Sequence, residues 1–567
     1  MSVPLFFATA FPEFKKQQSF FSALEKLYPE LAGSAHEAGW LGIAPDRLSG
    51  VDRVGSGGGE PSRFAASLHL SDGSTQPVFV KRIHLLDPIR AMEGEYVWPQ
   101  DGALPASSDL WKAALKKINE PLNEAYVDAL FAACASNLVE SGTSPHWCRS
   151  FGTFSARVDT YLYNITDEYD SLRRKPWWNR NQRLGLFKYY RDEAAEAAAS
   201  NFLTEGLTTI DTGDFEEVDA EEGGDVEEPV AFSEEPAASL EDPPLQLSTP
   251  KLRLSRMDAE DDSSNSSHEG SDGCDNSSES EGGRRSRAGS YNSELEQFAE
   301  FHDFPVQVTL LEHAEGTMDA LLEEECEEEE LTKEARWSSW LFQVIAGLVV
   351  AQHYYGFVHN DLHTNNVMWS STDQEFLYYR VTKASQVFHM KVPTHGKLMK
   401  IIDFGRASYH LPEPAGFFIS DAFFPGNDAA EQYNCEPFYD KDDGKVVEPN
   451  RSFDLARLSV SLLDALYPDR PEAVKPVRIM SKEPGKMYSE TVSSVYNLLW
   501  EWLQDDEGKN ILRLPDGEER YPDFDLYRAL AADVHRAIPS KQIEKALFSG
   551  YRVESVPEGA TVYDLIL

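Results

Sequence analysis

The sequence predicts an α+β protein with a small β-rich N-terminal lobe, a long acidic insertion in that lobe, and a mainly helical C-terminal lobe. Short apolar runs between Gly, Ser and Asp turns begin at Val51 and are typical of strands. Helical spacing of apolar residues dominates later in the chain. The expected boundaries are a helical extension at 1–50, the first part of the N-terminal lobe at 51–170, the insertion at 171–300, the last strand and a connecting segment at 301–316, and the C-terminal lobe with its C-terminal helices at 317–567.

The composition supports a large core and disfavours polyanionic partners. The chain has 567 residues, of which 41% are hydrophobic and 11% aromatic. It has 52 Lys and Arg residues and 96 Asp and Glu residues, which give a formal net charge of -44. Such a charge repels nucleic acid and anionic membranes as a bulk property. We therefore expect neither as a partner.

The cysteines and the N-terminus indicate a soluble intracellular protein, cytoplasmic or nuclear. The 5 cysteines are an odd number and form no C-x-x-C pair, which is typical of free thiols in a reducing compartment. No basic region precedes the apolar "PLFFATAF", and no run approaches the roughly 20 apolar residues that cross a bilayer.

The N-terminal elements can be predicted in order. Helical spacing over residues 14–31, from Phe14 to Leu31, predicts an amphipathic helix. A Gly-rich turn, a strand, a Ser-Asp-Gly-Ser turn and the strand "PVFVKRI" then read as a β-meander. The stretch "NEAYVDALFAACASNLVES" predicts a helix, and "WCRSFGTFSARV" a further strand.

The insertion begins with the basic, aromatic stretch "RRKPWWNRNQRLGLFKYYR". This stretch could stack on single-stranded nucleic acid, but docking against the acidic insertion or the N-terminal lobe is the favoured interpretation. The acidic and Ser-rich residues that follow cannot bury enough apolar surface to offset their ordering entropy, so we expect the insertion to be largely disordered.

After the strand "FPVQVTLLEH", the stretch "ARWSSWLFQVIAGLVVAQHYYG" predicts a long buried helix. Polar residues that packing does not explain follow it in "YGFVHNDLHTNNVMW". Asp361 lies five residues before Asn366, and Asp403 ends the apolar strand in "KLMKIIDFGRAS". One carboxylate to orient an acceptor hydroxyl, with an amide oxygen and a second carboxylate to hold Mg2+ on nucleotide phosphates, is what phosphoryl transfer needs.

The motifs "HNDLHTNN" and "DFG" resemble the catalytic loop and metal-binding motif of the protein-kinase superfamily, of the Ser/Thr protein kinase type. The resemblance implies a bilobal protein-kinase-like fold with ATP and Mg2+ as cofactors. Asp361 would be the catalytic base, Asn366 and Asp403 the metal ligands, and His359 a structural part of the loop. Mg2+ prefers such hard oxygen ligands.

The strand "PVFVKRI" resembles the one that carries the phosphate-binding lysine, which makes Lys81 the candidate. An ammonium group among apolar residues needs a carboxylate partner. Glu124, near the start of the next helix, is the expected partner, with Glu120 and Asp128 as open alternatives.

Gly55 and Gly57 in "VGSGGGEPSRFAASL" resemble the phosphate-covering loop, because glycines let backbone amides approach phosphates. The loop departs from the family's pattern, since Glu60 stands at the position of the third glycine and Pro61 follows it. Either the alignment slips by a residue or the loop works differently.

The stretch "VTLLEHAEGTMDALL" resembles the hinge that receives adenine. Leu311 would be the gatekeeper, the backbone of Glu312 and Ala314 would bind the base, and Asp319 would approach the ribose. Downstream, "RSFDLARLSVSLLDALYP" resembles the buried helix whose Asp braces the catalytic loop, and Asp454 is the matching residue.

Some positions depart from the family's pattern. Asn360 stands where many protein kinases have an Arg that pairs with a phosphate on the activation segment, so activity is not expected to depend on phosphorylation of that segment. His363 stands where many have Lys, and no A-P-E motif follows "DFG". The alternating residues of "SSTDQEFLYYRVTKASQVFHMKVPTHGKLM" predict an extended β-hairpin. Together with "NLVESGTSPHW", this texture resembles kinase-like proteins of large nucleocytoplasmic DNA viruses, which would place the protein in a host cell.

The expected function is ATP-dependent transfer of the γ-phosphoryl group to Ser or Thr hydroxyls of protein substrates. Ser286 and Ser290 lie beside arginines in the 255–295 segment, which could be a site of autophosphorylation, although a solvated linker is the favoured interpretation. One alternative is a small-molecule kinase of the aminoglycoside or choline kinase type, in which the "D-L-H" form also occurs. Another is a pseudokinase scaffold that acts through the acidic insertion.

Overall fold

A computed structural model of the chain describes most residues on either side of the acidic segment. Internal contacts divide the chain into one unit of residues 1–205 and 291–567 and another of residues 206–290. Every described residue belongs to the first unit. The described residues are 10–11, 13–18, 48–53, 63–99, 109–191, 296–324, 330–411, 416–424, 427, 429–430, 432, 449–472, 474, 491–514, 519–521 and 525–567.

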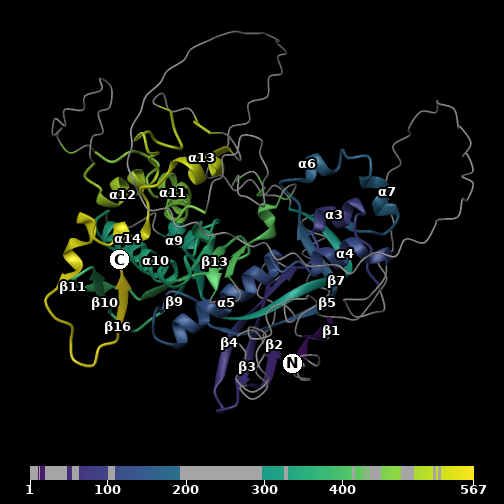
Figure 1. Ribbon diagram of the computed structural model, residues 1–567, viewed down its shortest axis with the longest axis horizontal. Helices are drawn as coiled ribbons and strands as arrows, with labels where there is room; N and C mark the ends of the chain where they lie inside the picture. The colour runs from purple at the N-terminus through teal and green to yellow at the C-terminus, as the bar shows by residue number, and fades with distance from the viewer. Residues whose placement is uncertain are drawn as a thin grey trace, which may run out of the picture. The chain divides into compact units, whose positions relative to one another are not determined.

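A seven-stranded antiparallel sheet organises the N-terminal half of the described residues (Figure 1). Its strands follow the spatial order β1, β5, β7, β4, β3, β2, and β6 pairs with the first residues of β7. The strands are β1 (Phe14–Gln18), β2 (Leu48–Arg53), β3 (Arg63–Leu70), β4 (Thr75–His84), β5 (Ser150–Asn164), β6 (Lys188–Arg191) and β7 (Gln297–Glu312).

The β4 strand shows how sequence pattern and register place a charged residue inside this sheet. Val78 and Val80 are fully buried, as expected for β-branched residues on the core face. Lys81 lies opposite Thr309 of β7 and Arg63 of β3, so its backbone is in the interior of the sheet. The ammonium group of Lys81 therefore cannot escape to water at an edge.

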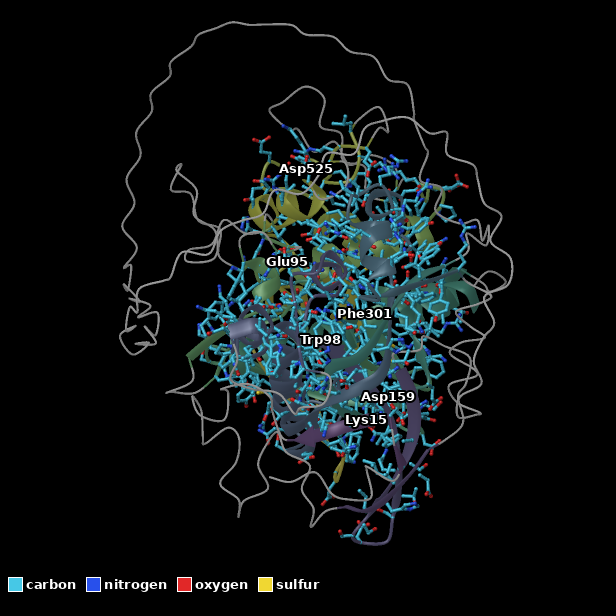
Figure 2. The ribbon with its side chains drawn as sticks, turned by 90° about the vertical axis from the view of Figure 1, so that its right-hand side faces the viewer. Lys15, Glu95, Trp98, Asp159, Phe301 and Asp525 are labelled. Atoms are coloured by element: carbon cyan, nitrogen blue, oxygen red, sulfur yellow. The ribbon has the colours of Figure 1, made fainter. Side chains whose placement is uncertain are left out.

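The helix predicted over residues 14–31 is wrong at its start, because Phe14–Gln18 forms the edge strand β1. Phe14 pairs with Val158 of β5, and its ring packs against Phe154 at 5.9 Å between centroids. An ion pair between Lys15 and Asp159 also joins the two strands (Figure 2). The long β5 strand offers a pairing edge, and tertiary pairing of this kind overrides local helical spacing.

The first part of the segment expected as an insertion at 171–300 is folded. The basic, aromatic stretch folds as part of two short helices and β6, and the ring of Trp178 is buried between Phe187 and Tyr189. The Asn181 side chain donates to the carbonyl oxygen of Met92 at 2.7 Å. This part of the insertion therefore packs against α3 (Pro88–Glu93) and the N-terminal sheet. This agrees with the interpretation that the stretch docks on the N-terminal lobe.

Helices cover the sheet and build the C-terminal half, so the α+β class predicted from the sequence is confirmed. The helix α5 packs on β5 and β7, whereas α10 contacts β12, α12 and α14. Within the described residues, no helix is both long and apolar enough to cross a bilayer. The helices are α3 (Pro88–Glu93), α4 (Lys112–Ile118), α5 (Glu124–Glu140), α6 (Tyr169–Leu172), α7 (Trp178–Arg183), α9 (Met318–Glu324), α10 (Glu330–Tyr355), α11 (Phe453–Leu466), α12 (Ser494–Trp502), α13 (Asp525–Asp533) and α14 (Pro539–Gln542), with 3-10 turns η1 (Asp109–Trp111), η2 (Thr364–Asn366), η3 (Asp421–Phe423) and η4 (Ala546–Tyr551).

The hairpin expected between Asn366 and Asp403 is confirmed. Strands β10 and β11 pair in an antiparallel register from Phe376↔Pro393 to Lys383↔Gln386, and the C-terminal strand β16 joins β10 in parallel (Figure 1). The smaller sheets are made by β8 (Gly316–Thr317), β9 (Val367–Ser371) and β12 (Lys397–Ile401), by β10 (Phe376–Lys383), β11 (Gln386–Pro393), β15 (Arg552–Val553) and β16 (Val562–Ile566), and by β13 (Ser408–Leu411) and β14 (Gly416–Ile419).

Gly347 lets α10 approach the buried His146 closely. The imidazole of His146 bridges the carbonyl oxygen of Met399 and the hydroxyl of Tyr379, at 3.0 and 2.8 Å. Burial lowers the pKa of His146 to about 3, so the ring is neutral at pH 7. A Cβ atom on Gly347 would lie 2.9 Å from the Cβ of His146, which is too close for either atom to stay in place.

We therefore expect Gly347→Val to lower the free energy of unfolding by about 2 kcal/mol, because overpacking a dense core displaces backbone and side chains. Chemical denaturation measures this change. Gly550→Val is the control, since nothing lies within 4 Å of a Cβ built on Gly550 and its φ is outside the left-handed region. A Gly347→Val variant as stable as the original protein would contradict the close approach.

Candidate active site

Lys81 lies at the centre of a buried charge cluster. Its side chain is 9% exposed, and its Nζ lies 2.6 Å from Asp128 Oδ1 and 3.0 Å from Asp403 Oδ1. Burial alone would lower the pKa of Lys81, but the two neighbouring carboxylates raise it above its ordinary value. Lys81 is therefore a fixed cation held between two acids that are far apart in the sequence.

The partner of Lys81 is Asp128, and the expectation that Glu124 would pair with it is wrong. Asp128 lies one helical turn after Glu124 on α5, is 1% exposed, and also accepts the backbone N–H of Phe404 at 2.7 Å. Glu124 instead pairs with His84, whose Nε2 lies 2.9 Å from its Oε1. Burial would raise the pKa of Glu124, but the nearby imidazole of His84 and the ammonium of Lys117 hold it at about 2.

A sequence signal for Asp128 exists. Every other residue from Ala125 to Ala135 is apolar or aromatic, so Asp128 is a carboxylate inside an otherwise apolar helix segment. A buried carboxylate needs a cation or several hydrogen-bond donors, and Lys81 is the cation that a neighbouring strand provides. The other open alternative, Glu120, accepts the backbone N–H of Leu122 at 3.2 Å and takes no part in the cluster.

The loop that carries Asp361 is held by Asp454, which is fully buried at the start of α11. Its two carboxylate oxygens accept the backbone N–H groups of His359 and Asn360, each at 3.0 Å. Asn360 has a φ of 64°, a left-handed conformation that Asn tolerates better than most residues. The ring of His359, also buried, hydrogen-bonds the carbonyl oxygen of Ile402 through Nε2 at 2.8 Å.

The pKa of Asp454 predicts a characteristic stability profile. Burial raises this pKa to about 7, although the two N–H donors act in the opposite direction. Between the ordinary Asp value near 3.9 and about 7, the folded protein holds a proton that the unfolded chain has released. The contribution of Asp454 to the free energy of unfolding therefore falls as pH rises through this window.

In Asp454→Asn this part of the pH dependence should be absent, and the unfolding free energy at pH 7 should drop by about 1–3 kcal/mol, because one backbone N–H loses its acceptor. Urea denaturation of both proteins from pH 4 to 8 measures the difference. Parallel pH profiles for the two proteins would contradict it.

Asn366 and Asp403 are brought together by backbone pairing. The N–H of Ile402 donates to the carbonyl oxygen of Asn366 at 3.0 Å, so the residue before Asp403 is bonded to the loop. The amide nitrogen of Asn366 donates to the carbonyl oxygen of Asp361 at 2.9 Å, so the nitrogen end of the side chain is turned toward the loop backbone. Asp403 has a φ of 67°, and the turn directs its carboxylate to Lys81.

The residues expected to contact a nucleotide have additional structural partners. The Glu312 carboxylate lies 3.0 Å from Lys400 Nζ and accepts the N–H of Arg149 at 3.0 Å, joining β7 to β12 and the start of β5. Its own N–H donates to the carbonyl oxygen of Arg149 at 2.8 Å. Ala314 is buried, and Asp319 accepts the hydroxyl of Thr364 at 2.6 Å. The sequence interpretation missed Lys400, which is buried in an apolar strand.

Gly55 and Gly57 lie outside the described residues, as do Ser286 and Ser290. A cavity of about 360 Å³ adjoins the charge cluster. Lys81, Asp361 and Asp403 line one part of it, and Asp87 with residues of β4, α3, α4, α5, β5, β7 and the chain after Asp403 line the rest. Glu312, Ala314 and Asp319 are not among the residues that line it.

Lys81, Asp361 and Asp403 line one cavity, while Asp128, which pairs with Lys81, and Asn366, which is bonded to Asp361, lie outside its lining. Such a set can hold an anionic group against Lys81 and a divalent cation against the oxygen ligands, with Asp361 facing the same space.

No family model matches the chain. A probable serine/threonine-protein kinase from Dictyostelium discoideum is 35% identical to it over 80 residues, which are 14% of this chain and 7% of that relative. The chain therefore matches a small part of the relative's length. This partial similarity suggests at most a kinase-like relationship.

Proposed function

We propose that this chain is an ATP- and Mg2+-dependent protein kinase with a bilobal kinase-like fold, which transfers the γ-phosphoryl group to Ser or Thr hydroxyls of proteins. The observation that supports the proposal most is the convergence of Lys81, Asp128 and Asp403 in one buried cluster. These three residues lie on separate segments, and the cluster adjoins Asp361. A structural role alone would not require Asp361 to face the same space.

Each residue has a role in the proposed transfer. Lys81, kept charged by Asp128, binds phosphate oxygens. Asp361 accepts a hydrogen bond from the acceptor hydroxyl and orients it for in-line attack. Asn366 and Asp403 hold the metal, and Mg-ATP, when bound, supplies the activated phosphoryl group.

The residues present fit Mg2+. Within the described residues, no group of three or more His, Cys, Asp and Glu side chains gathers in a metal-binding arrangement. Mg2+ in kinase-type sites takes one or two protein oxygens and completes its shell with phosphate oxygens and water. The amide oxygen of Asn366 and the carboxylate of Asp403 are ligands of this kind.

The test is incubation of the full chain with γ-labelled ATP, Mg2+ and a mixture of protein acceptors, followed by mass-spectrometric mapping of the label. Label on Ser or Thr that disappears when EDTA removes the metal supports the proposal, and label in the 255–295 segment would identify autophosphorylation. Nucleotide binding without protein labelling would contradict the protein acceptor and point to a small molecule. The absence of nucleotide binding would contradict the enzymatic proposal and favour a scaffold.

A further inference from the structure

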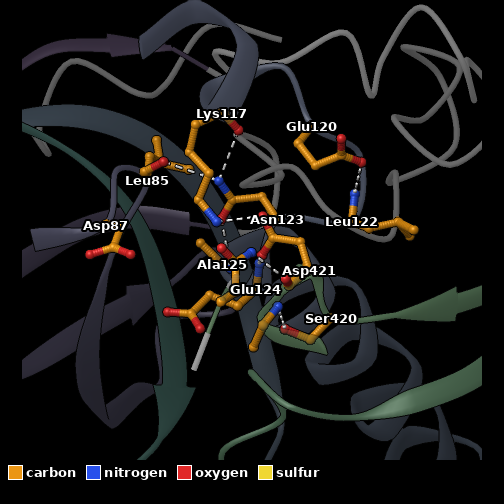
Figure 3. A network of polar contacts seen from close by, with 12 residues as sticks. Leu85, Asp87, Lys117, Glu120, Leu122, Asn123, Glu124, Ala125, Ser420 and Asp421 are labelled. Carbon is orange, nitrogen blue, oxygen red and sulfur yellow. Dashed lines mark hydrogen bonds and ion pairs between the residues drawn. The ribbon is translucent and has the colours of Figure 1, made fainter. Parts of the chain in front are cut away.

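A buried carboxylate joins the chain after Asp403 to the start of α5. Asp421 is 2% exposed and lies at the beginning of η3, where the Ser420 side chain caps the turn. Its Oδ1 accepts the backbone N–H of Glu124 at 3.1 Å, and its Oδ2 pairs with the ammonium of Lys117 (Figure 3). The N–H of Asp421 donates to the carbonyl oxygen of Leu122 at 2.7 Å.

A second connection holds the same segment against α3. The side chain of Asn427 donates to the carbonyl oxygen of Asp421 at 2.6 Å. The guanidinium of Arg90 in turn donates to Asn427 Oδ1 at 2.8 Å. The residues around Asp421 are therefore bound to α3, α4 and α5 together.

The charges explain why a carboxylate is suited to this position. The N–H groups in the first turn of a helix attract a negative charge, and Lys117 adds a full positive charge. Burial raises the pKa of Asp421 to about 6, and Lys117 acts in the opposite direction. At pH 7 the group is therefore an anion that α4 and α5 share.

Asp421 holds the start of α5, and α5 also carries Asp128. Glu124 is the first residue of α5, and Asp128 lies one turn further on the same helix. A shift of the first turn of α5 would move Asp128 away from Lys81 Nζ, which is 2.6 Å from it. The contact at Asp421 is thus one helical turn away from the charge cluster.

Asn360, the residue before Asp361, is neutral, which is consistent with a structural role for Asp421. Asn360 is a neutral amide whose side chain donates to the carbonyl oxygen of Arg406 at 3.0 Å and lies 3.3 Å from the hydroxyl of Ser408. Asn360 itself therefore supplies no positive charge. The carboxylates near Lys117 are those of Asp421 and Glu124.

We propose that Asp421 is a positioning residue, which holds α5 in the place where Asp128 pairs with Lys81, so that the chain after Asp403 needs no phosphate to fix the helix. This inference rests on the proposed function for its kinetic consequence but not for its structural one.

The test compares Asp421→Asn with Asp505→Asn in the full-length protein. Asp505 forms a matched buried pair with Arg520, at 5% and 16% side-chain exposure, against 3% and 19% for Asp421 and Lys117. In Asp421→Asn we expect faster hydrogen exchange in the first two turns of α5, a kcat lower by about tenfold and a raised KM for ATP, because the first turn of α5 and the Lys81–Asp128 pair are coupled through one helix. Asp505→Asn should leave all three unchanged.

Lys117→Met serves as a second variant if Asp421→Asn does not fold, and it should act in the same direction. Phosphatase treatment of the original protein should leave its activity unchanged. Unaltered exchange in α5 and unaltered kcat in the folded Asp421 or Lys117 variant would overturn the proposal, as would activity that phosphatase removes together with a phosphate on residues 404–432. If the original protein transfers no phosphate, the proposed function fails, and the exchange measurement alone still decides whether Asp421 holds the helix.

Discussion

Replacing Asp361 by Asn is expected to lower kcat for phosphoryl transfer by about 10²–10⁴-fold, the range that a positioned acid or base contributes. Asn has the same shape but cannot take up the proton of the acceptor hydroxyl. The loop itself should keep its place, because Asp361 bonds to Asn366 through its backbone carbonyl oxygen and Asp454 holds the preceding residues. The loss should therefore be in turnover, with the affinity for Mg-ATP nearly unchanged.

Steady-state transfer from labelled ATP measures the turnover, and calorimetric titration with Mg-ATP measures the affinity. Asp373→Asn is the matched control, since Asp373 is an exposed carboxylate in the turn after β9 and the change removes the same charge without touching the loop. An Asp361→Asn protein that turns over as fast as the Asp373→Asn protein would exclude Asp361 from the chemistry.

The residues of the loop could be predicted because they are close together in the sequence. Asp361 and Asn366 are five positions apart and bond to each other locally, so their spacing alone carries the pattern. The strand before Asp403 and the long helix before Asp361 are also visible as apolar periodicity. The chemistry of these segments is a local property of the chain.

Other parts of the site depend on how distant segments meet. The choice among Glu120, Glu124 and Asp128 is set by the rotation of α5 relative to β4, which helical periodicity does not determine. Asp421 belongs to no recognisable motif, and its partner Glu124 lies 297 positions away in the chain. The apolar spacing that begins at Phe14 predicts a helix, but pairing with β5 makes Phe14–Gln18 a strand.

Asp128→Ala is expected to have the largest effect on stability, about 3–5 kcal/mol, because it leaves a buried ammonium short of one of its two carboxylates. The backbone N–H of Phe404 also loses its acceptor, so the turn at Asp403 loosens. Transfer activity should fall with it, since Lys81 would no longer be held in place. Chemical denaturation and the transfer assay measure the two losses separately.

Glu124→Gln is the matched control, because it changes the other carboxylate of the same helix, whose partner is His84, and keeps the backbone N–H that Asp421 accepts. Glu124→Gln should leave activity near that of the original protein. An equal loss of activity in Glu124→Gln and Asp128→Ala would support the role first expected of Glu124, that of the partner of Lys81.

The double variant Lys81→Met/Asp128→Leu separates stability from function. Replacing both members of a buried ion pair by apolar residues of similar size is often neutral or stabilising. The double variant should therefore recover much of the stability that Asp128→Ala loses and yet transfer no phosphate, because Lys81, the cation proposed to bind it, has been removed. Recovery of both stability and activity would show that the cluster serves packing alone. Recovery of neither would show that Asp128 is necessary because it accepts the N–H of Phe404, more than because it neutralises Lys81.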